Sequence, residues 1–127
     1  MIRVAFDIDD TLYECRPKYR DQAPDHDMIG VLRWFHKNGD KVYVWSAGGL
    51  DYATQMISKL GINDYVVGAI RKDSASAKEY GITLAFDDCA EFEAKETGVT
   101  TIQVNRVHQV PIPSKAQILS AIKDTNS

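Results

Sequence analysis

Five short apolar runs alternate with segments of helical pattern along the chain, and this alternation constrains the fold more than any other feature. Each run is mostly β-branched or aromatic, which is typical of strands buried on both faces. The runs cover residues 2–6, 42–45, 65–70, 82–86 and 101–104. Strands that alternate with helices are expected to pair in parallel, because each helix carries the chain back to the start of the next strand.

The segments between the runs carry apolar residues at helical spacing, and several of them end at a glycine. Asp25 or Asp27 is placed to cap the first helix, whose apolar positions continue to Phe35. Further helices are predicted over residues 51–60, 74–80, 89–97 and 114–123. We therefore expect an α/β fold, a Rossmann-like three-layer sandwich of about five parallel strands with helices on both faces.

The length of the chain limits its organisation. It has 127 residues, which is the size of one domain, whereas a (β/α)₈ barrel needs about 250 residues. No internal repeat or low-complexity segment divides the sequence. We therefore expect residues 1–127 to form a single domain.

Charge and composition argue against two broad classes of function. Acidic residues outnumber basic residues by 18 to 15, for a net charge of -3, whereas a general nucleic-acid-binding surface is normally basic. No apolar run is long enough to cross a bilayer, and Arg3, Asp7 and Asp9 interrupt the N-terminal apolar segment. The two cysteines do not make a disulfide scaffold. We expect a cytoplasmic protein without a membrane partner.

The predicted strand ends carry acidic side chains that suit a metal-assisted reaction. Asp7 and Asp9 follow the first strand, and Asp87 and Asp88 follow the fourth. The carboxyl ends of parallel strands share one edge of a sheet, where ligands bind, so these carboxylates are expected to meet and to repel one another. A divalent cation would relieve that repulsion, and oxygen ligands without a nearby His favour Mg²⁺.

The second and third strands bring groups suited to an anion to the same edge. Ser46 ends the second strand and is followed by Ala47 and two glycines, whose backbone amides are hydrogen-bond donors. Lys72 follows the third strand and adds a positive charge. Anion donors beside a metal and free carboxylates indicate phosphoryl transfer, in which one carboxylate acts as nucleophile and its i+2 neighbour as general acid and base.

Four motifs in this order resemble those of the haloacid dehalogenase-like (HAD) phosphohydrolase superfamily. The first is an apolar strand followed by Asp-x-Asp-x-Thr, which residues 4–11 match in full. The second is a strand that ends at Ser46, the third is a single cation, here Lys72, and the fourth is an acidic pair after a strand, at residues 87 and 88. The resemblance covers roughly residues 2–104 in order and spacing.

The resemblance implies a role for each matching residue. Asp7 would attack phosphorus and become an aspartyl-phosphate, and Asp9 would protonate the leaving group and then activate the hydrolytic water. Ser46, the amide of Ala47 and Lys72 would hold the phosphoryl oxygens.

The same resemblance implies a ligand set for Mg²⁺. The side chain of Asp7, the backbone carbonyl of Asp9 and either Asp87 or Asp88 would bind the ion. Which member of the acidic pair touches the metal directly stays open at this point.

Two further assignments stay open. Arg71 and Lys78 are rivals of Lys72 for the role of the phosphate-binding cation. Some relatives carry another acidic residue after the pair, and Glu91 and Glu93 are the candidates for it.

The spacing of the motifs leaves no room for the cap domain that many relatives insert. Only 25 residues separate Ser46 from Lys72, and a helix and a strand use them up. We therefore expect a capless member, with residues 13–24 as a flap loop beside the site. Basic and aromatic residues of this flap would bind an extended anionic substrate, such as a nucleic-acid end, or the segment is a solvated loop. An open site admits a large substrate or is covered by a second copy of the chain, as a homo-oligomer.

Three other classes of protein match part of this pattern, but the sequence lacks a residue that each of them requires. A serine hydrolase could order Ser46, Asp87 and His108 as a triad, but its GxSxG turn needs glycine where Val44 stands. A phospho-acceptor receiver domain needs a lone Asp after the third strand and a Lys after the fifth. A calcium loop that began at the first acidic cluster would have Leu12 at its glycine position.

The sequence thus predicts a Mg²⁺-dependent phosphatase that hydrolyses phosphoric monoesters through an aspartyl-phosphate. The sequence does not identify the substrate, which is a small molecule or a macromolecule. Nucleic acid is expected as a partner only if it is the substrate. The alternatives are a non-catalytic, phosphate-binding relative and a phosphatase that acts on nucleic-acid ends or other macromolecules.

Overall fold

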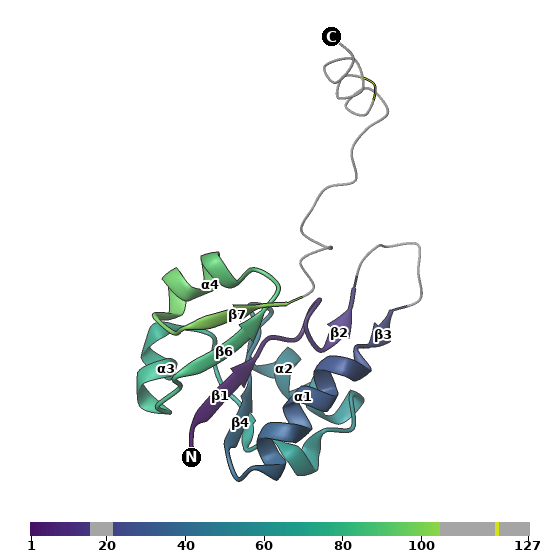
Figure 1. Cartoon of the computed structure of the whole chain (residues 1–127), viewed down its shortest axis with the longest axis horizontal. Helices are drawn as coiled ribbons and strands as arrows, with labels where there is room; N and C mark the ends of the chain where they lie inside the picture. The colour runs from purple at the N-terminus through teal and green to yellow at the C-terminus, as the bar shows by residue number, and fades with distance from the viewer. Residues whose placement is uncertain (16–21, 105–118, 120–127) are drawn as a thin grey trace.

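A five-stranded parallel sheet forms the centre of the computed structural model, which describes residues 1–15, 22–104 and 119 (Figure 1). Its strands are β1 (Arg3–Phe6), β4 (Lys41–Val44), β5 (Gly68–Ala69), β6 (Leu84–Asp87) and β7 (Thr101–Gln103). Their order across the sheet is β5-β4-β1-β6-β7, and all four pairings are parallel. The predicted α/β fold with about five parallel strands is confirmed, and the sheet is open rather than closed into a barrel.

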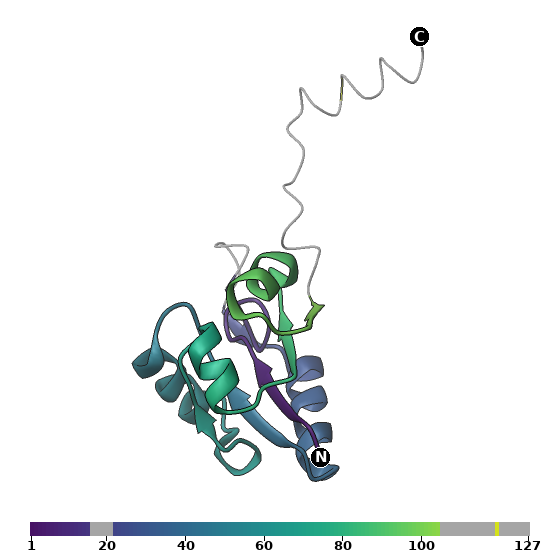
Figure 2. The same ribbon diagram turned by 90° about the vertical axis from the view of Figure 1, so that its left-hand side faces the viewer.

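Helices cover both faces of this sheet (Figures 1 and 2). On one face lie α1 (His26–Lys37) and α2 (Leu50–Lys59), and on the other lie α3 (Ser74–Glu79) and α4 (Ala90–Thr97). Asp25, rather than Asp27, caps α1, because its carboxylate accepts a hydrogen bond of 3.0 Å from the amide of Met28. None of the helices in the described part of the chain combines the length and the apolar character that crossing a bilayer requires.

The central strands bury side chains on both faces in turn, as period-two alternation requires. Val4 and Phe6 join the core beneath α1 and α2, whereas Ala5 between them joins the core beneath α3. In β4, Val44 points to the first core and Tyr43 to the second. Because helices cover both faces of the sheet, its polar groups lie at the ends of the strands.

Two elements differ from the sequence expectation. The third apolar run, predicted as a strand over residues 65–70, forms only the short strand β5, and the 3₁₀ turn η1 (Asn63–Tyr65) precedes it. The expected flap loop contributes a two-stranded antiparallel hairpin from its two ends, β2 (Tyr13–Glu14) and β3 (Ala23–Pro24). Tyr65 and Val66 still pack against the core, so burial of this run does not require strand conformation.

The described residues contain no cap domain between β1 and β4 or between β4 and β6, in agreement with the spacing argument. The basic residues of the flap, at positions 16, 18 and 20, lie outside the described residues. The helix predicted over residues 114–123 also falls outside them, apart from Leu119.

Candidate active site

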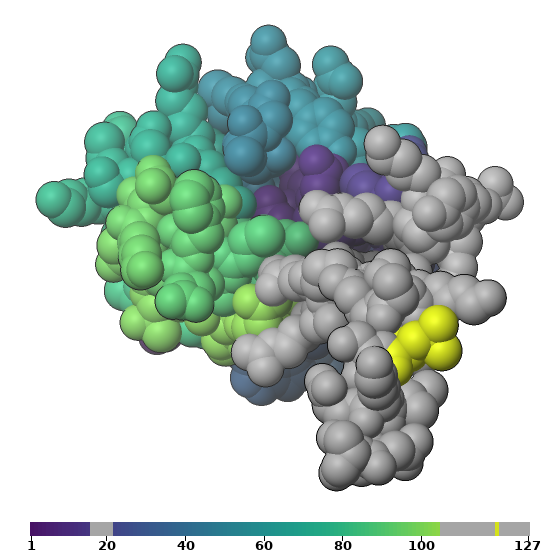
Figure 3. All heavy atoms as spheres, turned by 90° about the horizontal axis from the view of Figure 1, so that it is seen from above, coloured from purple at the N-terminus to yellow at the C-terminus, as the bar shows by residue number. Residues whose placement is uncertain are grey.

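The ends of β4, β1 and β6 bring three predicted site residues to one edge of the sheet. Phe6 pairs with Val44 on one side and with Phe86 on the other. The residues just beyond these positions, Asp7, Ser46 and Asp87, therefore share the carboxyl edge. Seen from above this edge, the purple atoms of the N-terminal segment lie in a hollow between the blue and teal atoms and the green atoms (Figure 3).

Lys72 joins the two acidic strand ends. Its ammonium nitrogen lies 3.1 Å from Asp7 Oδ1, 2.6 Å from Asp87 Oδ2 and 3.3 Å from Glu93 Oε1. The lysine side chain is only 4% exposed, whereas its two rivals, Arg71 and Lys78, are exposed. Of the three candidate cations, Lys72 is the one that the structure brings into the acidic cluster.

Negative charge exceeds positive charge in this cluster. Burial raises the pKa of Asp7 well above its usual value; the Lys72 charge opposes that shift, and the Asp87 charge adds to it. Burial and the neighbouring Asp87 carboxylate raise the pKa of Asp88 to about 6, and burial also raises that of Glu93. One ammonium group therefore does not balance the carboxylates, and the site favours a further cation.

Burial alone would lower the pKa of Lys72, but the carboxylates outweigh burial. The charges of Asp7 and Asp87 hold this pKa above its usual value, with Glu93 contributing. Lys72 therefore stays protonated throughout the physiological range and is a fixed positive charge at the site.

The donors at the end of β6 suit a hard divalent cation. Ligand atoms of Asp87, Asp88 and Cys89 lie within 4.8 Å of one another, and Asp7 is close enough for both aspartates to influence its pKa. Carboxylate oxygens are the ligands that Mg²⁺ prefers. The acidic residues present therefore fit the ion that the sequence predicts. Binding of that ion by the backbone carbonyl of Asp9 stays a prediction.

A side chain from β7 fixes the backbone of this acidic loop. The amide nitrogen of Gln103 donates to the carbonyls of Asp88 and Val104, and its oxygen accepts from the amide of Ala90 at 3.1 Å. Gln103 was not among the predicted site residues, because a glutamine within a predicted strand carries no motif.

A tight turn after β1 orients the two predicted catalytic aspartates differently. The carbonyl of Ile8 accepts from the amides of residues 11, 12 and 13, and Asp10 takes a left-handed conformation with φ of 60°. Thr11 closes the turn by donating its hydroxyl to Asp7 Oδ2 at 3.2 Å. Asp7 therefore faces Thr11 and Lys72, while Asp9 lies on the side of α2.

Asp9 contacts a residue that was not among the predicted site residues. The hydroxyl of Tyr52, on α2, donates to Asp9 Oδ1, and the thiol of Cys15 lies 3.4 Å from the same oxygen. Burial, reinforced by the Asp9 carboxylate, raises the pKa of Tyr52 above its usual value. The same causes raise the pKa of Cys15 to about 12. Both groups therefore remain protonated donors to Asp9.

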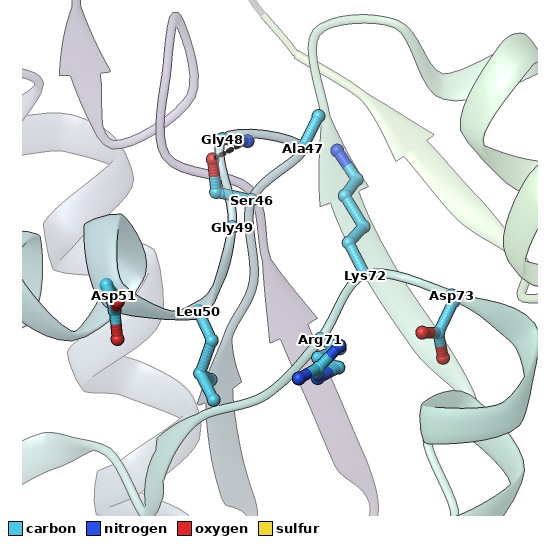
Figure 4. A pocket seen from close by; sticks show the side chains of 9 residues that line it. All are labelled: Ser46, Ala47, Gly48, Gly49, Leu50, Asp51, Arg71, Lys72 and Asp73. Atoms are coloured by element: carbon cyan, nitrogen blue, oxygen red, sulfur yellow. Dashed lines mark hydrogen bonds between the residues drawn. The ribbon is translucent and has the colours of Figure 1, made fainter.

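The loop from Ser46 to the start of α2 borders an open cavity of about 460 Å³ (Figure 4). Ser46 Oγ accepts the amide of Gly48 at 3.0 Å, and Gly49, with φ of 103°, begins the helix. Lys72 extends along the cavity towards the Ala47 side of this loop, whereas Arg71 leaves the same segment in another direction. A hydroxyl, backbone amides at a helix start and an ammonium group thus surround a space that suits an anion.

No protein-family model matches the chain, and no curated protein matches it significantly.

Proposed function

We propose that this protein is a Mg²⁺-dependent phosphatase of the capless HAD type, which hydrolyses phosphoric monoesters through an aspartyl-phosphate on Asp7. One observation carries the proposal: the buried Lys72 ammonium group contacts both Asp7 and Asp87 and borders the cavity of the Ser46 loop. A nucleophile, an anion-binding loop, a cation and a metal-type carboxylate set are thus adjacent. A phosphoryl group in the cavity would meet each of them.

In the first step, a carboxylate oxygen of Asp7 attacks phosphorus and forms an acyl-phosphate bond. The bond from phosphorus to the ester oxygen breaks, and Asp9 donates its proton to that oxygen. Lys72 opposes the effect of burial on Asp7 and so favours the ionised, nucleophilic carboxylate.

In the second step, Asp9 accepts a proton from water, whose oxygen attacks the phosphorus of the aspartyl-phosphate. Inorganic phosphate leaves and the Asp7 carboxylate is restored. Ser46, the amides of the following loop and Lys72 would stabilise the negative charge on the phosphoryl oxygens in both steps.

Asp7, Asp87 and Asp88 would hold Mg²⁺, with the Asp9 carbonyl as the further ligand that the resemblance implies. The ion would supply positive charge that offsets the carboxylates and polarises the phosphoryl group. The excess of buried carboxylates over the one ammonium group supports this assignment.

Hydrolysis of a generic aryl phosphate tests the proposal, with purified protein in Mg²⁺ and in chelator. Turnover should require Mg²⁺ and should be lost in Asp7→Asn, while Asp64→Asn, at an exposed position of η1, should retain it. Metal-independent turnover, or turnover in Asp7→Asn, would contradict the mechanism.

The non-catalytic alternative predicts a different result in the same experiment. Such a protein would bind inorganic phosphate in Mg²⁺ without hydrolysing aryl phosphates or phosphorylated macromolecules. The substrate, the homo-oligomeric state and the cytoplasmic location stay predictions.

A further inference from the structure

A second cavity, of about 450 Å³, lies on the other side of Gly48 from the Ser46 cavity. Gly48 lines both spaces, and Asp9 lines only the second. Because Gly48 lines both cavities, the second is within reach of the leaving group of an ester whose phosphoryl group lies in the first. We name this space the tyrosine pocket, after Tyr13 and Tyr52, which line it with Met56 and Lys59.

The tyrosine pocket lies where a leaving group would be. Asp9, the proposed proton donor to the ester oxygen, is held at its wall by the hydroxyl of Tyr52. A Cβ added at Gly48 would come within 3.1 Å of the Tyr52 ring and 3.3 Å of Ser46 Oγ. The Tyr52 ring therefore lies against the anion-binding loop, and its hydroxyl connects it to the proposed acid.

Two aromatic rings and a thioether line the tyrosine pocket, together with the thiol of Cys15 and the polar side chains of Asp9, Gln22 and Lys59. Tyr13 comes from β2 and Tyr52 from α2, and the thioether of Met56 lies one helical turn beyond Tyr52. Lys59 holds the Tyr13 ring in place, with its ammonium group 4.7 Å from the ring centroid and 3.2 Å from the hydroxyl. Aromatic rings and thioethers pack favourably against flat rings through stacked or edge contacts.

We propose that the tyrosine pocket selects phosphate monoesters whose leaving group carries an aromatic ring close to the ester oxygen. The inference rests on the proposed function, since it assigns the leaving-group side of the same site. Tyr52 has two parts in it: its ring contacts the aromatic leaving group, and its hydroxyl positions Asp9.

Two esters separate ring recognition from leaving-group chemistry and from simple apolarity. In 2-phenylethyl phosphate and 2-cyclohexylethyl phosphate the leaving alcohols are of similar size and acidity, and the cyclohexyl group is at least as apolar. A merely apolar pocket would bind the cyclohexyl ester equally well or better. The Asp7→Asn protein, which should not turn over either ester, allows both to be measured by calorimetry in Mg²⁺.

The phenyl ester should bind between about twofold and tenfold more tightly than the cyclohexyl ester, the range expected for one aromatic pair. Adding Tyr52→Leu should bring the ratio of the two dissociation constants close to one, whereas adding Tyr52→Phe, which keeps the ring, should preserve it. Any change in Asp9 affects both esters alike and cancels in the ratio. Binding of inorganic phosphate verifies that each variant is folded.

Failure of the pocket and failure of the phosphatase give different results. A ratio near or below one, or a ratio that survives Tyr52→Leu, overturns the tyrosine pocket, even if aryl phosphates are hydrolysed. Binding of inorganic phosphate without binding of either ester also overturns the pocket alone, whereas no binding of phosphate or of either ester overturns the phosphate site and the pocket together. A ratio that depends on the Tyr52 ring supports the pocket, even if no ester is turned over by the unmodified protein.

Discussion

The ammonium group of Lys72 lies 3.1 Å from Asp7 Oδ1, so the proposed nucleophile is paired with a positively charged side chain of the same protein. Burial acts against the charge of both partners, and the opposite charge of the other partner counters that effect in each case. The same lysine also contacts Asp87 and Glu93. Substitutions in this cluster should therefore have unequal effects on stability, depending on which charge is left without a partner.

Asp7→Asn should lower kcat by roughly 10³-fold or more, because the amide is a poor nucleophile. Its free energy of unfolding should change by less than about 1 kcal/mol, since Lys72 keeps two carboxylate partners and one buried charge is removed. Steady-state kinetics and urea unfolding measure the two effects. A folded variant with substantial turnover would exclude Asp7 as the nucleophile.

Asp9→Asn should lose activity most severely on esters of poor leaving groups, because in the proposed mechanism Asp9 supplies the proton to the departing oxygen. The expected result is a steeper dependence of kcat/KM on the pKa of the leaving alcohol than in the unmodified protein. A series of aryl and alkyl phosphates measures that slope. Equal losses across the series would argue against a leaving-group acid.

Lys72→Met should destabilise the protein by about 3–5 kcal/mol, because it leaves buried carboxylates without their counter-ion. Mg²⁺ should restore part of this loss by binding the same carboxylates. The matched variant Arg71→Met removes an exposed charge from the neighbouring position and should change the free energy of unfolding by less than about 0.5 kcal/mol. Similar losses in both variants would show that Lys72 has no special electrostatic part.

In chelator, the Asp88 carboxyl should make the protein less stable as pH rises from about 4 to about 6. Its pKa is raised from 3.8 to about 6 by folding, so the folded state binds the proton more tightly than the unfolded state. The stabilising contribution is complete below pH 3.8 and is lost as pH rises through about 6.

The difference in unfolding free energy between the unmodified protein and Asp88→Asn isolates this effect from other titrating groups. That difference should fall over the same pH interval and then stay level. Saturating Mg²⁺ should reverse the slope, because the metal binds the deprotonated form. A difference that is independent of pH would contradict the assignment.

Gln103→Leu should weaken Mg²⁺ binding severalfold without removing any proposed ligand. Its hydrogen bonds to the backbone of Asp88 and Ala90 hold the acidic loop against β7, and losing buried hydrogen bonds costs about 1–3 kcal/mol. Calorimetric titration with Mg²⁺ measures the change. Gln55→Leu, at an exposed position of α2, is the control and should bind Mg²⁺ as the unmodified protein does.

Much of the fold could be predicted because the hydrophobic pattern, and with it the order of strands and helices along the chain, is present in the sequence. Valines and aromatics that alternate between two cores produce apolar runs, and these marked β1, β4, β6 and β7. The run at residues 65–70 misled the prediction, because Tyr65 and Val66 pack on the core from a 3₁₀ turn and a loop. Apolar character reports burial, and it does not distinguish a strand from a buried turn.

The candidate site could be predicted where its residues lie at or just beyond the ends of strands, as Asp7, Ser46 and Asp87 do. Lys72 was harder to assign, since only the burial of its side chain separates it from Arg71. Tyr52 and Gln103 act through contacts between elements distant in sequence, which no local pattern reports. A tyrosine in the first turn of the helix after Ser46 was the one available signal, because that turn must lie at the same sheet edge.

The position of β1 at the centre of the sheet also determines when the site can form during synthesis. The proposed nucleophile, Asp7, directly follows β1, the first of these strands to be synthesised, yet β1 pairs on one side with β4 and on the other with β6, whose residues begin at position 84. A nascent chain that ends before β6 would expose one edge of β1 and would offer Lys72 neither Asp87 nor Glu93 as a partner. Folding therefore depends on long-range pairing. Most of the chain must leave the ribosome before Lys72 can meet all of its carboxylate partners.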